Sequence, residues 1–361
     1  MKTISVIGLR GFPGVQGGVE MHCENIYTRM HSCYRLRIYR RRPYLSEVSA
    51  RKFKNIEYVD LPSTRIKGLE AVIHTFLAAI HIIFHRPDAV HIHNIGPGMF
   101  APLLKLFRIP IILTYHSPNY EHTKWGAMSR AILKLSEKLS LSCAEKIIFV
   151  NSFQREKFGE KVLAKSVFIP NGINKTKIGR STGSLRTLEI EPRDYILSVG
   201  RLTPEKGFEY LVEAVNKLDE VKHLVIVGTS DHETGYFRLL KQLDAGDKVI
   251  FTGFMQGEDL RQLYSHARLY VLSSVNEGFP LVLLEAMSYR LPLVVSDIPA
   301  THLIELPEDN YVEAANSDAL AEGIKNALAK DFELQNYDLS NYNWDSIAQQ
   351  TLAVYKQVLE K

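Results

Sequence analysis

The stretch TISVIG, residues 3–8, runs directly into LRGFPGVQGGVE, residues 9–20. The first part predicts a short buried strand, and the second a glycine-containing turn that opens a helix over residues 20–30. Glycines let a backbone approach a phosphate, and the N–H groups of a helix start point toward an anion. The spacing is neither the G-x-G-x-x-G dinucleotide fingerprint nor a Walker loop. This segment alone therefore fits an ordinary strand-to-helix turn as well as a phosphate-binding loop.

The same alternation of strand and helix continues along the chain, which indicates parallel sheets built from βαβ units. Further strands are predicted at residues 56–61, 89–93, 109–115, 146–150, 195–200, 224–228, 249–252, 269–273 and 293–296. Further helices are predicted at residues 69–84, 128–142, 208–218, 281–289, 316–329 and 344–361.

A polar stretch over residues 175–193 interrupts the pattern and predicts a linker. We therefore expect an α/β protein with two doubly wound, Rossmann-like domains that face a cleft. The first would span residues 1–180 and the second 181–343, with a last helix, 344–361, packing back toward the first domain. Open parallel sheets bind ligands beyond the carboxyl ends of their strands, so residues at strand ends take priority.

Composition excludes several classes of protein. The chain has 361 residues, of which 45% are hydrophobic and 23% are charged, as in soluble globular proteins. Its three cysteines are too few and too scattered for a disulfide scaffold, and they indicate a reducing, cytoplasmic compartment. The start does not resemble a secretory signal. The longest apolar run, residues 71–84, is interrupted by two histidines and is short of the roughly 20 residues of a membrane-spanning helix.

Charge is divided unevenly along the chain. Residues 1–180 carry 28 Lys and Arg against 12 Asp and Glu, a net +16, whereas residues 181–361 carry a net −12. Such asymmetry favours an anionic partner for the first half, and an anionic membrane surface is preferred over nucleic acid. The densest cluster is Arg35–Arg42, whose alternating start predicts a strand edge followed by a basic loop. We expect that loop, or residues 71–84, to rest on the inner face of the cell membrane.

Two motifs of the second half carry candidate chemistry. Arg201 and Lys206 share the loop after the strand at 195–200, where both can reach a diphosphate. Glu277 precedes a glycine turn, and Glu285 lies in the following helix among apolar neighbours. A buried carboxylate needs hydrogen-bonding partners, and a pair of ribose hydroxyls would serve. A capping Glu277 and a structural ion pair at Glu285 remain the alternative.

Histidines form a further pattern. His91 and His93 alternate on one strand, so their rings share a face. They suggest a metal pair, but no third ligand is near in the sequence, so we expect a structural or cleft-lining role and no metal site. His116 ends the strand at 109–115.

Together with FIPNGI, residues 168–173, these motifs resemble the family 4 glycosyltransferases of GT-B fold. The matching stretches also include residues 199–207, 249–254 and 272–300. The opening loop is similar to a subgroup of bacterial capsule and exopolysaccharide transferases, some described as rhamnosyltransferases.

The resemblance implies a retaining transferase that uses a nucleotide-diphosphate sugar, with no cofactor and no essential metal. It implies that Arg201 and Lys206 hold the diphosphate, that Glu285 takes the ribose hydroxyls, and that Glu277 and His116 contact the donor sugar. The remaining donor-binding positions it implies are Gly17, Gly18, Phe254, Gly278, Phe279, Pro280 and Leu281. The acceptor would be a glycan or a polyprenyl-diphosphate-linked acceptor, and the basic first half fits the membrane-linked kind.

One position departs from the family's pattern, because Arg290 stands where the family has a helix-ending glycine. That position often takes φ > 0, which costs a residue with a side chain about 1 kcal/mol or more. Two other functions remain open: a nucleotide-sugar epimerase of the same fold, and a non-catalytic protein that binds nucleotide sugars or polyanions.

Overall fold

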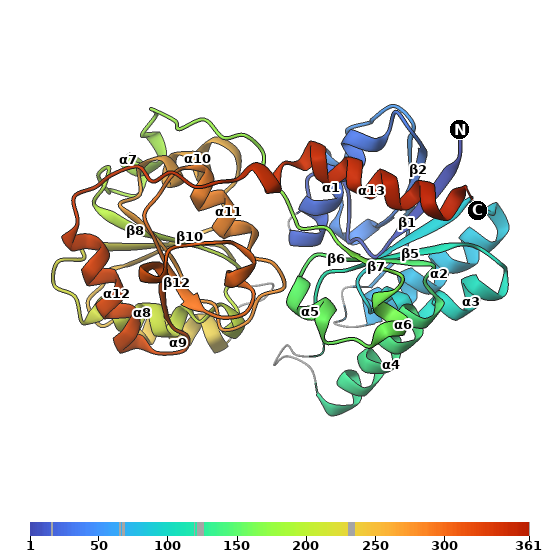
Figure 1. Cartoon of the computed structure of the whole chain (residues 1–361). Coiled ribbons are helices and arrows are strands. Elements are labelled where there is room, and N and C mark those ends of the chain that lie inside the picture. The colour runs from blue at the N-terminus through green and yellow to red at the C-terminus, as the bar shows by residue number, and fades with distance from the viewer. Residues whose placement is uncertain are drawn as a thin grey trace. The chain divides into compact units, whose positions relative to one another are not determined.

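The computed structural model describes residues 1–15, 17–64, 66, 69–118, 120, 126–229 and 235–360. The chain forms two compact units, one of Met1–Gly172 with Asn341–Lys361 and one of Ile173–Ser340 (Figure 1). The second unit thus begins within the stretch expected to end the first domain. The last helix, α13 (Trp344–Leu359), packs against α1 (Gly18–Met30) of the first unit. Among the described helices, none is long and apolar enough to cross a membrane.

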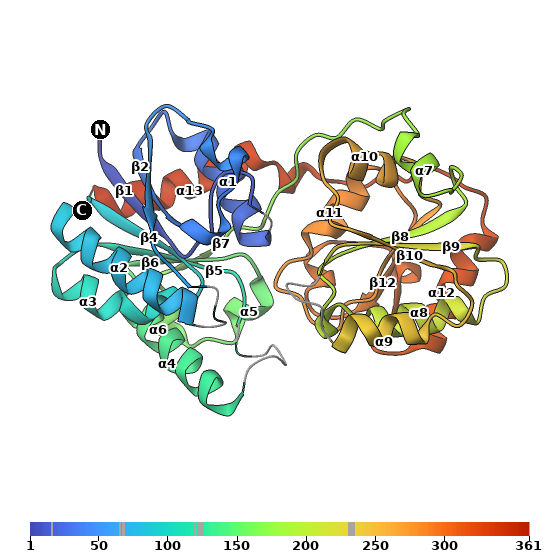
Figure 2. The ribbon, with the colours of Figure 1, turned by 180° about the vertical axis from the view of Figure 1, so that it is seen from behind.

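The first unit contains a parallel sheet of seven strands in the order β3-β2-β1-β4-β5-β6-β7. Its strands are β1 (Thr3–Ile7), β2 (Arg35–Arg41), β3 (Ile56–Leu61), β4 (Ala89–His93), β5 (Ile111–Tyr115), β6 (Lys146–Phe149) and β7 (Ser166–Phe168). Its other helices are α2 (Leu69–His85), α3 (Ala101–Leu106), α4 (Ala127–Cys143), α5 (Ser152–Glu156) and α6 (Glu160–Leu163). Helices α1 and α13 cover one face, and α2, α3 and α4 cover the other (Figure 2).

The second unit contains six parallel strands in the order β10-β9-β8-β11-β12-β13. These strands are β8 (Tyr195–Val199), β9 (His223–Val227), β10 (Val249–Gly253), β11 (Leu269–Leu272), β12 (Leu293–Asp297) and β13 (Tyr311–Glu313). The helices are α7 (Gly183–Thr187), α8 (Phe208–Asn216), α9 (Gly235–Leu243), α10 (Gly257–His266), α11 (Leu281–Ser288) and α12 (Ser317–Ala329). Helices α8, α9 and α12 lie on one face of the sheet, and α7, α10 and α11 lie on the other (Figure 1).

The predicted fold class is confirmed, and so are the predicted strands and long helices within a few residues. Both sheets are buried on both faces, which is why their strands are nearly continuous apolar runs. Strands β7 and β13 were missed because three residues are too few to establish a periodicity. The expected linker, residues 175–193, is wrong in part because it contains the short helix α7.

The expectation of a basic surface loop at Arg40–Arg42 is wrong for Arg40 and Arg41, whereas Arg42, which follows the strand, is exposed. Strand β2 continues through Arg41, and both Arg40 and Arg41 are buried. Arg40 lies opposite Asp60 in the register of β2 and β3, and its Nε and Nη2 donate to the two carboxylate oxygens at 2.6 and 2.8 Å. Its Nη1 donates to the carbonyls of Phe12 and Ser49. Arg40 and Arg41 stabilise the first unit and are not available to a membrane.

Candidate functional site

The order of the second sheet places its first strand, β8, between β9 and β11. The chain leaves β8 toward one side and later returns to β11 on the other, and in open α/β sheets this arrangement forms a crevice at the carboxyl ends of the two strands. Ligands of open α/β sheets bind at such a switch point. The loop 200–207 follows β8 and the loop 273–280 follows β11, so both predicted motifs border this crevice.

The two loops are in direct contact. Gly207 has a φ of 60°, and a Cβ on it would lie 2.2 Å from the carbonyl oxygen of Ser273. Only glycine permits that approach. The Ser273 hydroxyl donates to the Lys206 carbonyl oxygen at 2.9 Å. The backbone that carries Lys206 is therefore fixed against the end of β11.

Lys206 and Glu277 meet at this edge of the sheet. The Lys206 Nζ lies 2.5 Å from Glu277 Oε1, and the Ser274 hydroxyl donates to the same oxygen at 2.7 Å. The two side chains are only 14% and 10% exposed, so the ion pair is largely desolvated. Among the described residues, the other oxygen of Glu277, Oε2, has no hydrogen-bond partner.

Arg201 begins the same loop and is more accessible. Its Nη2 lies 3.6 Å from Glu205 Oε1, and 36% of its side chain is exposed. The aliphatic part of Lys206 passes over Gly200, where a Cβ would lie 3.4 Å from its Cδ and Cε. The structure thus places both predicted cations on one loop at one edge of the sheet.

Glu285 lies on α11, beside α10. The Tyr264 hydroxyl donates to its Oε2 at 3.0 Å, and Tyr264 stacks on Tyr289 with ring centroids 5.0 Å apart. Burial among these groups raises the pKa of Glu285 from 4.5 to about 7, although the Tyr264 hydrogen bond opposes the shift. A carboxylate that is desolvated and receives one hydrogen bond from the described residues is suited to bind a ligand's hydroxyl groups.

The remaining donor positions predicted for this unit divide into two groups. Gly278 to Leu281 lead from Glu277 into the N-terminus of α11, whose dipole favours an anion. Phe254 follows β10, an edge strand separated from β8 by β9, and is 46% exposed. The structure does not place Phe254 against the other four donor side chains of this unit.

The first unit has a switch point of the same kind between β1 and β4. Gly8 follows β1 with a φ of 105°, and a Cβ on it would lie 2.2 Å from the carbonyl oxygen of His93. Gly17 has a φ of 149° and would clash with Glu20, whose Oε1 accepts from the Arg10 backbone N–H at 3.0 Å. Gly18 begins α1. Close approach and a positive φ therefore require glycine at position 8, after β1, and at position 17, before α1.

Four histidines gather at this edge of the first sheet. His116 follows β5, and its Nε2 lies 3.1 Å from Nδ1 of His93, the last residue of β4. His22, on α1, packs edge-on against His116 with ring centroids 4.7 Å apart. His91 is held by Thr114, Tyr27 and Tyr355. The expectation that His91 and His93 have no third possible ligand nearby is wrong, because the fold brings His22 of α1 and His116 beside His93, although His22 is about 70 positions away in the sequence.

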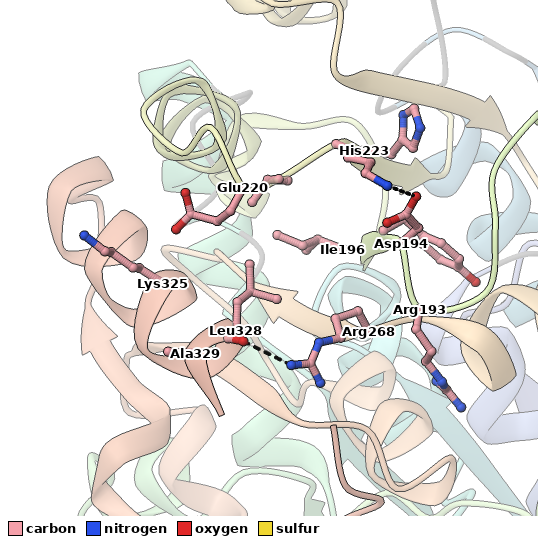
Figure 3. A pocket seen from close by; sticks show the side chains of 12 residues that line it. Arg193, Asp194, Ile196, Glu220, His223, Arg268, Lys325, Leu328 and Ala329 are labelled. Atoms are coloured by element: carbon pink, nitrogen blue, oxygen red, sulfur yellow. Dashed lines mark hydrogen bonds and ion pairs between the residues drawn. The ribbon is translucent and has the colours of Figure 1, made fainter. Parts of the chain in front are cut away.

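A cavity of about 380 Å³ lies elsewhere in the second unit (Figure 3). Tyr195 and His223, the first residues of β8 and β9, line it together with Arg268, which precedes β11. It is therefore at the amino ends of the strands, opposite the edge that carries Lys206 and Glu277. An Asp194–Lys222 ion pair closes one side of it at 2.7 Å.

Arg290 adopts the left-handed conformation predicted for the usual glycine position, with a φ of 62°. Its Nε donates to the Gln335 carbonyl oxygen at 3.0 Å and its Nη2 to Asn336 Oδ1 at 2.7 Å. The side chain therefore fastens the segment after α12 to the end of α11.

Comparison with known proteins agrees with this architecture. A curated relative, an uncharacterized glycosyltransferase of Methanocaldococcus jannaschii, is 39% identical over 46% of this chain and 45% of its own length. An amylovoran biosynthesis glycosyltransferase of Erwinia amylovora is 24% identical over 69% of this chain and 70% of its own. This chain spans between 43% and 62% of the length of the first three curated relatives it matches.

Two solved structures share the fold over essentially the whole chain. Sucrose-phosphate synthase from Thermosynechococcus elongatus has a TM-score of 0.83 at 21% identity and covers 100% of both chains. Anabaena HepE, solved in complex with UDP and glucose, has a TM-score of 0.73 at 20% identity and covers 100% of this chain and 98% of its own.

Two family models account for most of the sequence. The model described as Glycosyltransferase Family 4 matches residues 16–177, and the model described as Glycosyl transferases group 1 matches residues 185–343. Each match takes in most of one of the two sheets. The chain therefore belongs to the family 4 glycosyltransferases of GT-B fold.

Proposed function

We propose that the protein is a retaining glycosyltransferase that moves a sugar from a nucleoside-diphosphate sugar to a glycan acceptor. The observation that carries this proposal is the Lys206–Glu277 pair, which stands with Arg201 at the switch point of the second sheet. HepE, solved with UDP and glucose, supports a nucleotide-sugar donor.

The diphosphate is assigned to Arg201, Lys206 and the N-terminus of α11. Lys206 is neutralised by Glu277 while no donor is bound, and a diphosphate provides a second anionic partner for it. Charge-assisted hydrogen bonds of this kind are worth about 1.5–3 kcal/mol each. These groups supply the positive charge without Mg²⁺ or Mn²⁺, so binding of the nucleoside diphosphate is expected to survive excess EDTA.

The two glutamates have separate roles in this proposal. Glu277 accepts bonds from Lys206 and Ser274 through Oε1, so Oε2 is assigned to a hydroxyl of the donor sugar. Glu285 uses Oε2 for Tyr264, so its Oε1 is assigned to the ribose hydroxyls. Both assignments use an oxygen to which no described residue donates.

Bond cleavage leaves negative charge on the phosphate. Arg201, Lys206 and the start of α11 would stabilise that charge, and the loss of one such donor typically costs about 3–4 kcal/mol. We assign no carboxylate as a nucleophile. Attack of the acceptor from the side of the leaving group, with the phosphate oxygen taking the acceptor proton, is the mechanism that these residues permit. It retains the anomeric configuration.

A panel of UDP, GDP, ADP and dTDP sugars tests the reaction, with product formation and anomeric configuration followed by NMR. Lys206→Ala is expected to reduce turnover at least 100-fold. Lys222→Ala is the matched control, because its ion pair lies at the opposite edge of the same sheet. Conversion of the donor alone into an isomer would instead indicate an epimerase. Donor binding without any turnover on lipid-linked or soluble acceptors would indicate a binding protein.

We also propose that the acceptor is linked to polyprenyl diphosphate and belongs to a bacterial surface polysaccharide. The relative in amylovoran biosynthesis supports the polysaccharide. The similarity of the opening loop to capsule and exopolysaccharide transferases, some of them rhamnosyltransferases, supports the same assignment. A rhamnose donor therefore belongs in the panel of sugars.

Peripheral attachment to the inner face of the cell membrane is part of this proposal. Helices α2, α3 and α4 lie next to one another (Figure 2) and carry exposed apolar side chains. The side chains are Leu69, Val72, Ile73, Phe76, Ile80 and Phe84 of α2, Leu106 and Phe107 at the end of α3, and Met128, Ile132 and Leu135 of α4. Phe84 is 81% exposed and Leu106 is 77% exposed. Many exposed apolar side chains on neighbouring helices favour contact with a membrane or a protein.

The charges near this apolar surface favour an anionic membrane. Its exposed cations are Arg86, Lys105, Arg108, Arg130, Lys134 and Lys138. Each cation near an anionic leaflet contributes about 1 kcal/mol. The acidic residues of the same helices are engaged internally: Glu70 lies 3.7 Å from Arg41, and Glu137 accepts from Tyr115 at 2.5 Å.

Vesicle flotation tests the attachment. Binding to anionic vesicles is expected to weaken from 0.1 M to 1 M salt, because the Debye length falls from about 10 Å to about 3 Å. Phe76→Ser with Phe84→Ser is expected to abolish flotation and to leave UDP binding unchanged. Ile178→Ser with Leu239→Ser, which changes exposed apolar residues of the second unit, is the control. A wild-type protein that ignores anionic vesicles at low salt would contradict the proposal.

A further inference from the structure

Three histidines of the first unit bring their ring nitrogens together. One nitrogen from each of His22, His93 and His116 lies within 4.8 Å of the other two. His93 Nδ1 and His116 Nε2 are 3.1 Å apart. Two imidazole ligands of a tetrahedral zinc ion are separated by about 3.3 Å, given a Zn–N length of about 2.0 Å. This spacing therefore fits a shared ion as well as a hydrogen bond.

His22 supplies the second observation. It is 2% exposed, and its Nε2 is buried without any hydrogen-bond partner among the described residues. Its Nδ1 lies 2.7 Å from Asn171 Oδ1, which accepts the ring N–H. The nitrogen left over then carries a lone pair. A buried acceptor without a partner destabilises the folded protein, and a ligand at that position would remove this cost.

His93 is arranged in the same way. Its Nε2 lies 2.5 Å from the Tyr27 hydroxyl, on the far side of the ring from His116. A ring that donates Nε2–H to Tyr27 has its Nδ1 lone pair turned toward His116. In histidines that bind a metal, the N–H of the second ring nitrogen usually donates a hydrogen bond to such an acceptor. This bond fixes the tautomer and the ring orientation. Asn171 and Tyr27 meet that requirement for two of the three rings.

We propose that His22, His93 and His116 form a binding site for one divalent d-block cation, with zinc the expected occupant. The ligand set is all nitrogen, with neither thiolate nor carboxylate, and imidazole suits zinc, copper, iron and nickel but not magnesium or calcium. Three protein ligands leave at least one coordination position for an oxygen atom from water or a substrate. The site stands at the carboxyl ends of β4 and β5, where an open sheet binds its ligands.

The state of the imidazoles agrees with this assignment. Metal binding requires neutral rings, and burial lowers the pKa of His22 to about 4 and those of His93 and His116 well below 6.5. Protons therefore do not compete with a cation at neutral pH. His91 is not a ligand, because Thr114 holds its Nε2 and Tyr27 and Tyr355 approach its Nδ1.

The readout of this proposal is metal binding and not sugar transfer, so it can be tested separately from the diphosphate site of the second unit, although His116 is also the residue expected to contact the donor sugar. Metal content of the purified full chain is measured first. The protein is then freed of metal by chelator dialysis and titrated with Zn²⁺ against a chromophoric chelator. Titration with Co²⁺, whose visible absorption is strong only in four- or five-coordinate sites, gives the geometry.

We expect one zinc ion per chain and a zinc-dependent rise in melting temperature. His22→Ala is expected to abolish both, and Asn171→Ala to weaken zinc binding 10–100-fold because the ring loses its orientation. His81→Ala with His85→Ala is the control: these rings stack on α2, and His85 is exposed. Removing this pair is expected to leave the bound zinc in place.

The variants also separate a metal site from a folding role. His22→Ala removes a buried nitrogen without a partner, so its metal-free melting temperature is expected to stay close to that of the metal-free wild type. Asn171→Ala keeps the His22 imidazole. It therefore tests zinc binding if His22→Ala does not fold. Stoichiometric zinc binding that survives both substitutions would overturn the proposal, as would loss of the zinc in the His81→Ala and His85→Ala variant. So would a wild-type protein that retains no zinc and does not compete with the chelator.

Discussion

Glu285→Gln is expected to stabilise the protein at alkaline pH and to leave it nearly unchanged in acid. The amide can still accept the Tyr264 hydrogen bond, so the change removes the ionisation and keeps the shape. Burial raises the pKa of Glu285 from 4.5 to about 7. The folded state therefore prefers the neutral carboxyl. Its stabilising contribution is complete below pH 4.5 and is lost as the pH rises through 7.

The size of the effect follows from the separation of the two pKa values. Each pH unit of separation is worth about 1.4 kcal/mol, so ionisation of Glu285 costs the folded state about 3 kcal/mol at pH 8. For a unit of this size, 1 kcal/mol changes the melting temperature by about 2–4 °C. The gain of Glu285→Gln at pH 8 is then about 6–12 °C, and at pH 4 it falls close to zero.

Scanning calorimetry is the appropriate assay, because both tryptophans, Trp125 and Trp344, lie outside residues 173–340. Tryptophan fluorescence would therefore report unfolding of the first unit, whereas Glu285 belongs to the second. Glu258→Gln is the control, since Glu258 is an exposed glutamate of α10 and exposed ion pairs contribute little. An equal difference between wild type and Glu285→Gln at pH 4 and pH 8 would refute the reasoning, because it would show that the folded state does not penalise the charge.

The same ionisation connects stability to ligand binding. Ribose hydroxyls donate more strongly to a carboxylate than to a neutral carboxyl. Binding of UDP is therefore expected to strengthen as the pH rises toward 7 and then to level off. Glu285→Gln is expected to bind UDP more weakly and without this dependence. Titration calorimetry from pH 5.5 to 8.5 measures both. A carboxylate retained at this cost to stability is the pattern expected of a binding residue.

Three further substitutions test other parts of the structure. Glu277→Gln is expected to leave UDP binding largely intact and to impair use of the full donor; calorimetry with UDP and with the sugar nucleotide distinguishes this from the reverse assignment. Arg290→Gly is expected to be more stable than Arg290→Ala by about 1 kcal/mol in urea unfolding, because alanine keeps the strain of φ > 0 and glycine does not. Arg40→Gln is expected to lower the unfolding free energy by about 3 kcal/mol, since it breaks a buried pair and leaves the Phe12 and Ser49 carbonyls without their donor; wild-type stability would contradict the structural role.

Much of the fold is predictable from the sequence because each βαβ unit has a local apolar pattern of its own. The apolar runs at 195–200 and 269–273 predict strands without any knowledge of their neighbours. Once they are taken as parallel strands, the loops that carry Arg201, Lys206 and Glu277 must leave at the same edge. What the sequence does not contain is the contact itself. Lys206 and Glu277 are 71 positions apart, and only the order of the strands places β8 next to β11.

The errors have a common physical origin, because charge and spacing along a chain do not report burial. Arg40 adds to the basic count of the first half, yet strand register sets it opposite Asp60 and removes it from the surface. The charge excess itself is unaffected, since exposed cations on α4 and after α2 and α3 remain. Likewise His91 and His93 are recognisable as a pair on one strand. His22 reaches them from a helix about 70 residues earlier.

Both units use a glycine to bring backbone segments together at their switch points. In the first unit the glycine is Gly8, after β1. In the second unit it is Gly207, in the loop after β8. In each, a Cβ would lie 2.2 Å from a backbone oxygen at the end of the strand across the switch point, that of His93 or of Ser273. Gly8 directly follows its strand, whereas Gly207 ends the loop and precedes α8, and each brings its backbone against the end of the neighbouring strand with no side chain between them. The histidine cluster and the Lys206–Glu277 pair are both built on such a junction. Because the junction depends on backbone and not on side chains, the two sites can carry different chemistry, nitrogen ligands in one and a diphosphate clamp in the other, on the same underlying arrangement of strands.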